Sequence, residues 1–253
     1  MTPRCSFSGR KAVAKRRIDS LLVERGLVES RAKAQALIMA GEVVVAGEPV
    51  IKPGTLVKEE AAITIIEPPP FVSRGGIKLD HALDQFQLDV SFKVVADIGA
   101  STGGFTDCLL KRGASRVYAI DVGYGQLDYR LRQEPRVVVM ERVNARYPIP
   151  LSEKIDLATL DLSFISVEKV IPSVARLVKD SGYLLVLIKP QFEAKREEVG
   201  KGGVIKQPPV HARVLGRFIT WVINHGFRLR GLVASPILGA AGNREFFVLL
   251  RLT

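Results

Sequence analysis

The residues of this chain best suited to chemistry are an aspartate and a lysine that each end an apolar run. Asp161 follows Leu157–Leu160, and Lys189 follows Tyr183–Ile188. Packing alone does not readily explain a lysine at that position, although a lysine whose amine reaches solvent from a strand end is the alternative. A lysine amine can take a proton from a hydroxyl group when burial or a second cation lowers its pKa. The two residues therefore indicate general-base chemistry.

A glycine-rich segment, Asp97–Phe105, follows a predicted strand and opens a predicted helix with the sequence D-I-G-A-S-T-G-G-F. Glycine lets the backbone approach a ligand where a side chain would clash. The spacing is not the G-x-G-x-x-G pattern of dinucleotide-binding proteins, and the carboxylate of Asp97 would repel a diphosphate. A cationic cofactor suits this loop better.

Polar residues also follow the next two predicted strands. Asp121 ends the strand Tyr118–Ile120, and a carboxylate there can accept hydrogen bonds from both ribose hydroxyls of a nucleoside. Asn144 lies just after the third strand, where an adenine contact is expected. A nucleoside site without a diphosphate clamp fits S-adenosylmethionine. The predicted cofactor-binding residues are Asp97, Gly99, Ala100, Ser101, Thr102, Gly103, Gly104, Phe105, Asp121, Asn144 and Asp161.

A scaffold must bring these strand ends together. From residue 92 onward, apolar runs alternate with helical stretches, which is typical of a parallel sheet buried on both faces. Ligands of such sheets bind outside the carboxyl ends of the strands. The last two runs suit an antiparallel pair at one edge, so the predicted fold class is α/β and Rossmann-like. The predicted strands are Val94–Asp97, Val117–Val122, Val137–Met140, Ile155–Asp161, Leu184–Lys189, Leu229–Ser235 and Phe246–Leu252.

Three consecutive prolines, Pro68–Pro70, mark a boundary because they can continue neither a helix nor a central strand. Before them, two short helical patterns and several short strand patterns predict a small α+β domain. Ser30 is a plausible N-cap of the second helix. We divide the chain into a basic tail (1–16), a small domain (17–66), a proline-rich linker (67–72) and a catalytic domain (73–253).

The charge of the chain favours a polyanionic partner. The formal net charge is +11 and the sequence pI is about 9.8, which points to nucleic acid before an anionic membrane, although a merely basic enzyme is the alternative. Five basic residues gather in the small domain, where a solvated face is the plainer interpretation and phosphate contact the functional one. The predicted RNA-binding residues are Arg16, Arg17, Arg25, Arg31 and Lys33.

Other classes of protein receive little support. Two cysteines and three histidines lack metal-ligand spacing, which predicts no metal site, no disulfide scaffold and a reducing compartment such as the cytoplasm. No apolar run approaches the roughly 18 residues of a membrane span, and the N-terminus lacks the apolar core of a secretory signal. No membrane partner is therefore expected.

The sequence after Asp161 helps to separate base methylation from ribose methylation. Amino-group methyltransferases carry an Asn/Asp-Pro-Pro-aromatic run there, whereas this chain has Asp161–Phe164, D-L-S-F. Carbon-5 cytosine chemistry needs a thiolate near the same edge, and Cys108 lies in the helix after the glycine loop. A ribose 2′-hydroxyl acted on by a base agrees better with Lys189.

Two stretches of the chain resemble known families. The pattern from Arg17 to Val50, R-I-D-S-L-L-V-E-R-G and then G-E-V-V-V-A-G-E-P-V, resembles the small RNA-binding module named after a small-subunit ribosomal protein. Residues 72–252 resemble the FtsJ-like ribose 2′-O-methyltransferases. The whole chain looks like the TlyA family of ribosomal RNA methyltransferases, on the stretches Gly99–Phe105, Asp121–Leu127, Asp161–Ser166 and Lys189–Glu193.

The resemblance implies a catalytic tetrad of Lys78, Asp161, Lys189 and Glu245, with S-adenosylmethionine as cofactor and a cytidine ribose of ribosomal RNA or a ribosomal subunit as substrate. The chain ends just after its last predicted strand, as in the shorter subtype of this family, which implies the large-subunit RNA as target. Two alternatives stay open: a non-catalytic RNA-binding assembly factor, and a membrane-lytic protein, since members of the family have been labelled haemolysins.

Overall fold

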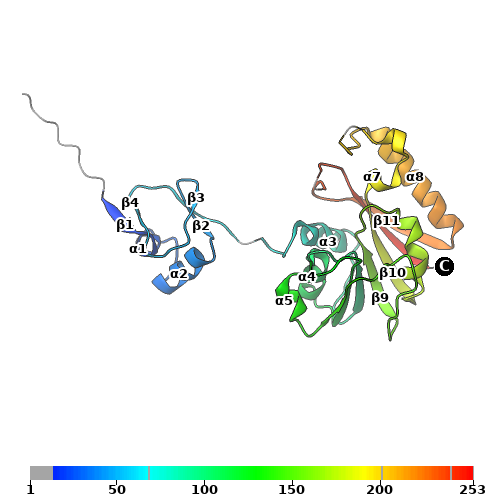
Figure 1. Cartoon of the computed structure of the whole chain (residues 1–253), viewed down its shortest axis with the longest axis horizontal. Coiled ribbons are helices and arrows are strands. Elements are labelled where there is room, and N and C mark those ends of the chain that lie inside the picture. The colour runs from blue at the N-terminus through cyan, green and yellow to red at the C-terminus, as the bar shows by residue number, and fades with distance from the viewer. Residues whose placement is uncertain (1–13, 68, 201, 240, 253) are drawn as a thin grey trace, which may run out of the picture. The chain divides into compact units, whose positions relative to one another are not determined.

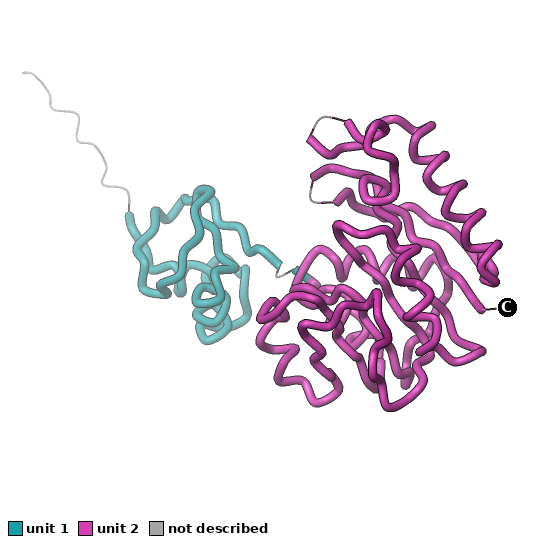
Figure 2. The backbone as a smooth tube through the Cα atoms, turned by 45° about the vertical axis from the view of Figure 1, so that its right-hand side comes forward, with its two compact units in different colours: residues 1–69 teal, residues 70–253 magenta. Residues whose placement is uncertain are grey.

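The computed structural model describes residues 14–67, 69–200, 202–239 and 241–252. The chain divides between Pro69 and Pro70 into two compact units, the N-terminal unit and the C-terminal unit (Figure 2). Most of the predicted basic tail lies outside the described residues. Its last part differs from the prediction, because Lys15 and Arg16 belong to the first strand of the N-terminal unit.

The N-terminal unit packs two short helices against small antiparallel sheets. One face of the first helix buries Ile18, Leu21 and Leu22, and the second helix begins at Ser30, whose hydroxyl accepts a hydrogen bond from the Lys33 amide, as an N-cap does. The strands form a two-stranded sheet, β1-β4, and a three-stranded sheet, β3-β2-β5. The elements are β1 (Lys15–Arg17), α1 (Ile18–Glu24), α2 (Arg31–Met39), β2 (Val43–Val45), β3 (Glu48–Pro49), β4 (Leu56–Lys58) and β5 (Ile63–Ile65).

The C-terminal unit is a seven-stranded sheet between two layers of helices, in the order β11-β12-β10-β9-β6-β7-β8 (Figure 1). Its elements, in chain order, are α3 (Arg74–Gln85), β6 (Val94–Ile98), α4 (Gly104–Lys111), β7 (Arg116–Ile120), α5 (Tyr129–Arg132), β8 (Val137–Met140), β9 (Ile155–Leu160), η1 (Val167–Lys169), α6 (Ile171–Ala175), β10 (Val178–Ile188), α7 (Pro190–Glu193), η2 (Arg196–Glu198), α8 (Pro208–Asn224), β11 (Phe227–Ala234) and β12 (Phe246–Leu252).

The neighbouring strands β8, β7, β6, β9 and β10 are parallel to one another. Strand β12 lies between β10 and β11 and is antiparallel to both. The predicted α/β class and the antiparallel edge are both confirmed. Alternate residues of each strand face opposite layers. In β7, Val117 packs against the layer that contains α3 and α4, whereas Tyr118 packs against the layer that contains α6 and α8. Both faces are therefore buried, which explains the continuous apolar runs.

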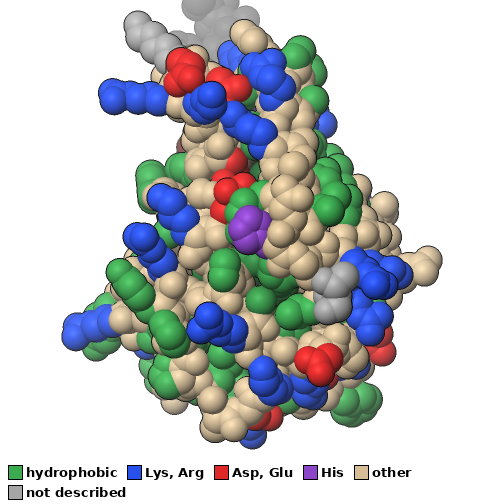
Figure 3. All heavy atoms as spheres, turned by 90° about the vertical axis from the view of Figure 1, so that its right-hand side faces the viewer, with side chains coloured by type: hydrophobic (Ala, Val, Ile, Leu, Met, Phe, Trp, Pro, Cys, Tyr) green, Lys and Arg blue, Asp and Glu red, His purple; other side chains and the backbone are tan. Residues whose placement is uncertain are grey.

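The surface is mixed in character. On the face shown in Figure 3, Lys and Arg side chains are spread over the molecule among apolar and acidic ones. Within the described residues, no helix combines the length and the apolar character that crossing a bilayer requires.

Candidate active site

The glycine loop joins the end of β6 to the start of α4 and closes against neighbouring segments. Gly99 has φ of +87°, and a Cβ there would lie 2.4 Å from the carbonyl oxygen of Asp161. Gly103 has φ of +95°, and a Cβ there would lie 2.3 Å from the Leu131 side chain. Side chains at these positions would be strained and would clash. Gly99 therefore lets the loop contact the end of β9, and Gly103 lets it contact α5.

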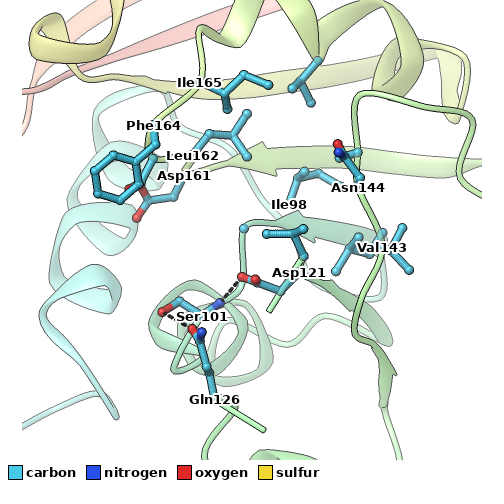
Figure 4. Close-up of a pocket in the computed structure, with 16 residues that line it drawn as sticks. Ile98, Ser101, Asp121, Gln126, Val143, Asn144, Asp161, Leu162, Phe164 and Ile165 are labelled. Carbon is cyan, nitrogen blue, oxygen red and sulfur yellow. Dashed lines mark hydrogen bonds between the residues drawn. The ribbon is translucent and has the colours of Figure 1, made fainter. Parts of the chain in front are cut away.

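A cavity of about 500 Å³ opens at the carboxyl ends of β6, β7 and β9 (Figure 4). Its wall contains five of the residues predicted to bind the cofactor: Gly99, Ser101, Asp121, Asn144 and Asp161. Apolar residues make up most of the remaining wall. They are Ile98, Ile120, Val122, Val143, Ala145, Leu162, Phe164, Ile165 and Val170.

The carboxylate of Asp121 is held by backbone amides at the edge of this cavity. Oδ2 accepts a hydrogen bond of 2.8 Å from the Ser101 amide, and Oδ1 accepts one of 2.7 Å from the Gly123 amide. The Gln126 side chain lies beside them and accepts a bond from the Ser101 hydroxyl (Figure 4). We had assigned no role to Gln126, although it lies in the stretch Asp121–Leu127 that resembles the TlyA family.

Asp97 differs from the prediction, because it does not reach the cavity. Its side chain is inaccessible to solvent and accepts hydrogen bonds from the hydroxyls of Thr106 (2.7 Å) and Thr159 (3.2 Å). Burial raises the pKa of Asp97 to about 7. The carboxyl group lies behind the glycine loop and joins β6 to α4 and β9.

The remaining predicted loop residues also lie outside the cavity wall. Phe105 is buried, and its ring stacks 6.0 Å from that of Phe247. These residues shape the loop and the first turn of α4 rather than line the cavity. They are Ala100, Thr102, Gly103, Gly104 and Phe105.

The four residues of the implied tetrad form two ion pairs at the same end of the sheet. Lys189 Nζ lies 2.6 Å from Asp161 Oδ1 and 3.0 Å from the Ser163 hydroxyl. Lys78 Nζ lies 2.6 Å from Glu245 Oε2. The Lys78–Glu245 contact is also a charge-assisted hydrogen bond, which fixes the orientation of both partners.

Strand register explains why these pairs occupy the same end of the sheet. Ile188 pairs with Phe246 across the antiparallel ladder, so Lys189 and Glu245 lie at facing ends of β10 and β12. Leu160 pairs with Val186 in the parallel ladder, which brings Asp161 to the same edge. Asp161 also lines the cavity, so it connects the ion pairs to the candidate cofactor site.

The two ion pairs differ in their access to water. The Lys78 and Glu245 side chains are 10% and 3% exposed, whereas those of Lys189 and Asp161 are 13% and 21% exposed. The first pair is buried between α3 and the start of β12, whereas Asp161 of the second pair lines the cavity. The two lysine side chains are about equally covered, so the position of Asp161 is what connects the second pair to the candidate site.

An exposed aromatic residue stands at the rim of the cavity. Phe164 is 91% exposed and adopts a positive φ of 64°, which is uncommon for a residue with a bulky side chain. Its ring lies 5.1 Å from that of Phe192. Phe164 is not among the predicted site residues, and the signal in the sequence is an aromatic residue directly after Asp161, Leu162 and Ser163.

Comparison with known proteins identifies this architecture. Residues 71–252, which include every element of the cavity and both ion pairs, match the family described as FtsJ-like methyltransferase. The chain belongs to the FtsJ-like methyltransferase family. Residues 16–63 match the S4 domain. The predicted combination of an FtsJ-like catalytic domain with a ribosomal-protein-type module is confirmed.

The similarity to known proteins extends over both units of this FtsJ-like methyltransferase. The 16S/23S rRNA (cytidine-2′-O)-methyltransferase TlyA of Mycobacterium tuberculosis is 44% identical over 93% of this chain and 89% of its own length. A solved structure from Streptococcus thermophilus, whose title names a hemolysin, is 42% identical with a TM-score of 0.72, over 96% of this chain and 90% of that chain. The resemblance to the TlyA family is confirmed.

More distant structures share the fold alone. An S-adenosylmethionine-dependent methyltransferase from Mesorhizobium loti is 15% identical with a TM-score of 0.52, over 68% of this chain and 96% of that chain.

In the S4 unit, all four arginines predicted to bind RNA also make contacts within the unit. Arg17 and Arg31 pair with Asp19, whose side chain is inaccessible to solvent, at 2.8 and 3.1 Å. Arg16 pairs with Glu24 at 2.7 Å. Arg25 donates to the backbone carbonyls of Glu59 and Ala61, and Lys33 is exposed.

These contacts leave positive charge at the surface of the unit. The arginine side chains that contact Asp19 and Glu24 remain about half exposed. Hydrogen bonds from Arg17 in particular hold the pKa of Asp19 well below its usual range. The arrangement therefore holds guanidinium groups in place while leaving them accessible to a phosphate.

Proposed function

We propose that this FtsJ-like methyltransferase transfers a methyl group from S-adenosylmethionine to a cytidine ribose 2′-hydroxyl of ribosomal RNA, with Lys189 as the general base. The observation that carries the proposal is the Lys189–Asp161 ion pair, because Asp161 also lines the cavity. That position supports Lys189 as the proton acceptor beside the site for the methyl donor. The name of the Mycobacterium tuberculosis relative supports the substrate class.

The cavity residues fit the cofactor. About 500 Å³ is within the range of small-ligand sites. The fixed carboxylate of Asp121 would bind ribose hydroxyls, and the apolar side chains of Val143 and Leu162 would contact the adenine, with Asn144 at the same wall. S-adenosylmethionine supplies an activated methyl group on a positively charged sulfur, which the carboxylate of Asp161 would attract.

The four ion-paired residues would have different roles. Lys189, in its neutral amine form, would accept the proton of the 2′-hydroxyl as the methyl group passes from the donor sulfur to that oxygen, and Asp161 and Ser163 would orient the amine. Lys78 supplies a second positive charge near the substrate, and Glu245 orients Lys78. Because the methyl donor is already activated, most of the rate enhancement would come from positioning.

Two exposed features would hold the RNA. An aromatic ring such as that of Phe164 offers a stacking surface for an unpaired base. The half-exposed arginines of the S4 unit, with Lys33, would contact phosphates and so provide affinity and placement rather than chemistry.

The test is methyl transfer from labelled S-adenosylmethionine to unmodified ribosomal subunits by the wild type and Lys189→Ala. The expected result is label at an alkali-resistant ribose, absent with the variant, which should bind the cofactor almost normally. Mapping the label would also show whether one or both ribosomal subunits are modified.

The other outcomes would each reject part of the proposal. Label on a base would keep the enzyme class and exclude ribose chemistry. Loss of cofactor binding by Lys189→Ala would make the lysine structural. Absence of label from the wild type, with intact cofactor binding, would favour the non-catalytic assembly factor.

A further inference from the structure

Two segments leave the sheet side by side next to the cavity. One follows β9 and runs from Asp161 to Val167, and the other follows β10 and runs from Lys189 to Glu193. The two segments contact each other at three places along their length. Lys189 contacts Asp161 and Ser163 next to the sheet, and the rings of Phe164 and Phe192 meet further along. Glu193 contacts Val167 at the far ends of the two segments.

Glu193 contacts Val167 through its carboxylate. Oε1 accepts a hydrogen bond of 2.9 Å from the backbone amide of Val167. Burial raises the pKa of Glu193, while hydrogen bonds from Ser166 and Val167 act in the opposite direction. A partly desolvated acid is costly to keep at a position where an apolar residue would pack. The hydrogen bond to the segment offsets part of that cost.

The segment that Glu193 contacts packs against the core through Leu162 and Ile165, but its middle is exposed. Ser163 and Phe164 are both exposed, and Phe164 has a backbone conformation that a bulky side chain rarely adopts. Such a conformation persists only where surrounding contacts impose it. Val167 is buried at the far end of the segment, so a bond to its amide fixes the end opposite Asp161.

We infer that Glu193 is a positioning residue, whose hydrogen bond to the Val167 amide holds Ser163 and Phe164 beside the amine of Lys189. This inference rests on the proposed role of Lys189 as general base. Glu193 touches neither the cavity wall nor the ion pairs directly, so it acts through the segment. Loss of the bond would let Ser163 leave Lys189 and Phe164 move from the cavity rim.

Three variants test this role. Glu193→Ala removes the acceptor, Glu193→Gln keeps an amide oxygen that can accept from Val167, and Glu168→Gln removes a neighbouring carboxylate. Glu168 is the matched control because it lines the same outer cavity as Glu193, of about 390 Å³, and burial raises its pKa too. Its side chain does not contact the segment through any hydrogen bond found in the described residues.

The measurement is the single-turnover rate of methyl transfer, expressed per cofactor-binding site so that unfolded protein is not counted. Misplacement of a catalytic group by about 1 Å can cost roughly 100-fold in rate. We expect Glu193→Ala to lose about tenfold or more in rate with cofactor affinity unchanged, Glu193→Gln to recover most of it, and Glu168→Gln to match the wild type. Hydrogen exchange of the Val167 amide should accelerate in Glu193→Ala alone.

Each contrary outcome would reject a different part of the inference. A wild-type rate in Glu193→Ala with fast exchange at Val167 would show that the segment need not be held. Equal losses in Glu193→Gln and Glu193→Ala would show that charge, rather than the hydrogen bond, matters. Lys189→Ala is measured in parallel: if it keeps full activity the proposed base is wrong, whereas an inactive Lys189→Ala beside a fully active Glu193→Ala overturns only the inference about Glu193.

Discussion

Each unit of the molecule contains an aspartate with no access to solvent, and the two respond to burial in opposite ways. In the S4 unit, Asp19 accepts hydrogen bonds from Arg17, Arg31 and Gln35, and these lower its pKa. In the methyltransferase unit, Asp97 has only neutral hydroxyls as side-chain partners, and burial raises its pKa to about 7.

The difference shows how buried charge can serve different purposes. Around Asp19, the ionised carboxylate fixes guanidinium groups that remain accessible, as an RNA-binding surface requires. Around Asp97, the carboxyl group joins elements behind the glycine loop, and the charged residues of the candidate site lie elsewhere, as the pairs Lys78–Glu245 and Lys189–Asp161. The inaccessible aspartate is therefore paired with half-exposed cations in one unit and bonded to neutral hydroxyls in the other.

The largest effect is expected where a buried ion pair of the methyltransferase unit loses one partner. Glu245→Ala leaves the ammonium of Lys78 without its carboxylate, which should cost about 3–5 kcal/mol of unfolding free energy as well as activity. Urea unfolding followed by fluorescence of the single tryptophan, Trp221, measures this unit.

A double variant, Lys78→Met with Glu245→Leu, is the control for that loss. It removes both charges and should regain most of the stability while remaining inactive. A double variant as unstable as Glu245→Ala would show that packing of the side chains, rather than the unpaired charge, caused the loss.

The second effect concerns the pH dependence of the methyltransferase unit. Because the pKa of Asp97 rises from 3.8 to about 7 on folding, the folded unit binds more protons than the unfolded chain between these values. Its unfolding free energy should therefore fall by up to about 4 kcal/mol as pH rises from about 4 to 7. Asp97→Asn should remove this fall in the Trp221 unfolding curves, and an unchanged slope in the variant would assign the dependence to other groups.

A smaller effect of opposite sign is expected in the S4 unit. Because the pKa of Asp19 is lowered on folding, its contribution is present above about pH 4 and is lost as pH falls further. Asp19→Asn should cost about 1–2 kcal/mol at neutral pH, since the arginine partners are half exposed. Hydrogen exchange in α1 measures this loss, and Trp221 unfolding should not change. A variant as stable as the wild type would mean that the arginines do not need Asp19.

The smallest effect concerns a single exposed charge. Lys33→Ala should weaken RNA binding and reduce the slope of log affinity against log salt by roughly 0.7–0.9, the effect of one phosphate contact. Lys93→Ala is the control, because Lys93 is exposed at the opposite end of the parallel strands from the cavity. Equal changes in both variants would indicate a general effect of net charge instead of a contact in the S4 unit.

Much of the fold could be predicted from the sequence because its signals are local. Continuous apolar runs of strand length predict strands buried on both faces, and the residues that follow them, such as Asp121, Asp161 and Lys189, must lie at the carboxyl edge. Glycines at positions that need positive φ, such as Gly99 and Gly103, predict the loop. The division near the prolines follows from their missing amide hydrogens.

What the sequence left open depends on which face a residue occupies and on partners far along the chain. Asp97 and Asp121 both looked like acids at strand ends, but Asp97 lies within β6, where the alternation of side chains turns it toward α4, whereas Asp121 follows the last residue of β7 and borders the cavity. The partnership of Lys78 with Glu245 was implied only by family resemblance.

The insertion of β12 between β10 and β11 brings Glu245 to the edge where Lys189 lies, and α3 then supplies Lys78 from 167 residues away. The elements, the glycine loop and the residue types at the strand ends could be predicted from the chain alone, because each depends on neighbours along the chain. Folding settles which acids are buried, which lysine pairs with which carboxylate, and that Glu193 accepts a hydrogen bond from the Val167 amide, because strand order and facing depend on contacts between distant segments.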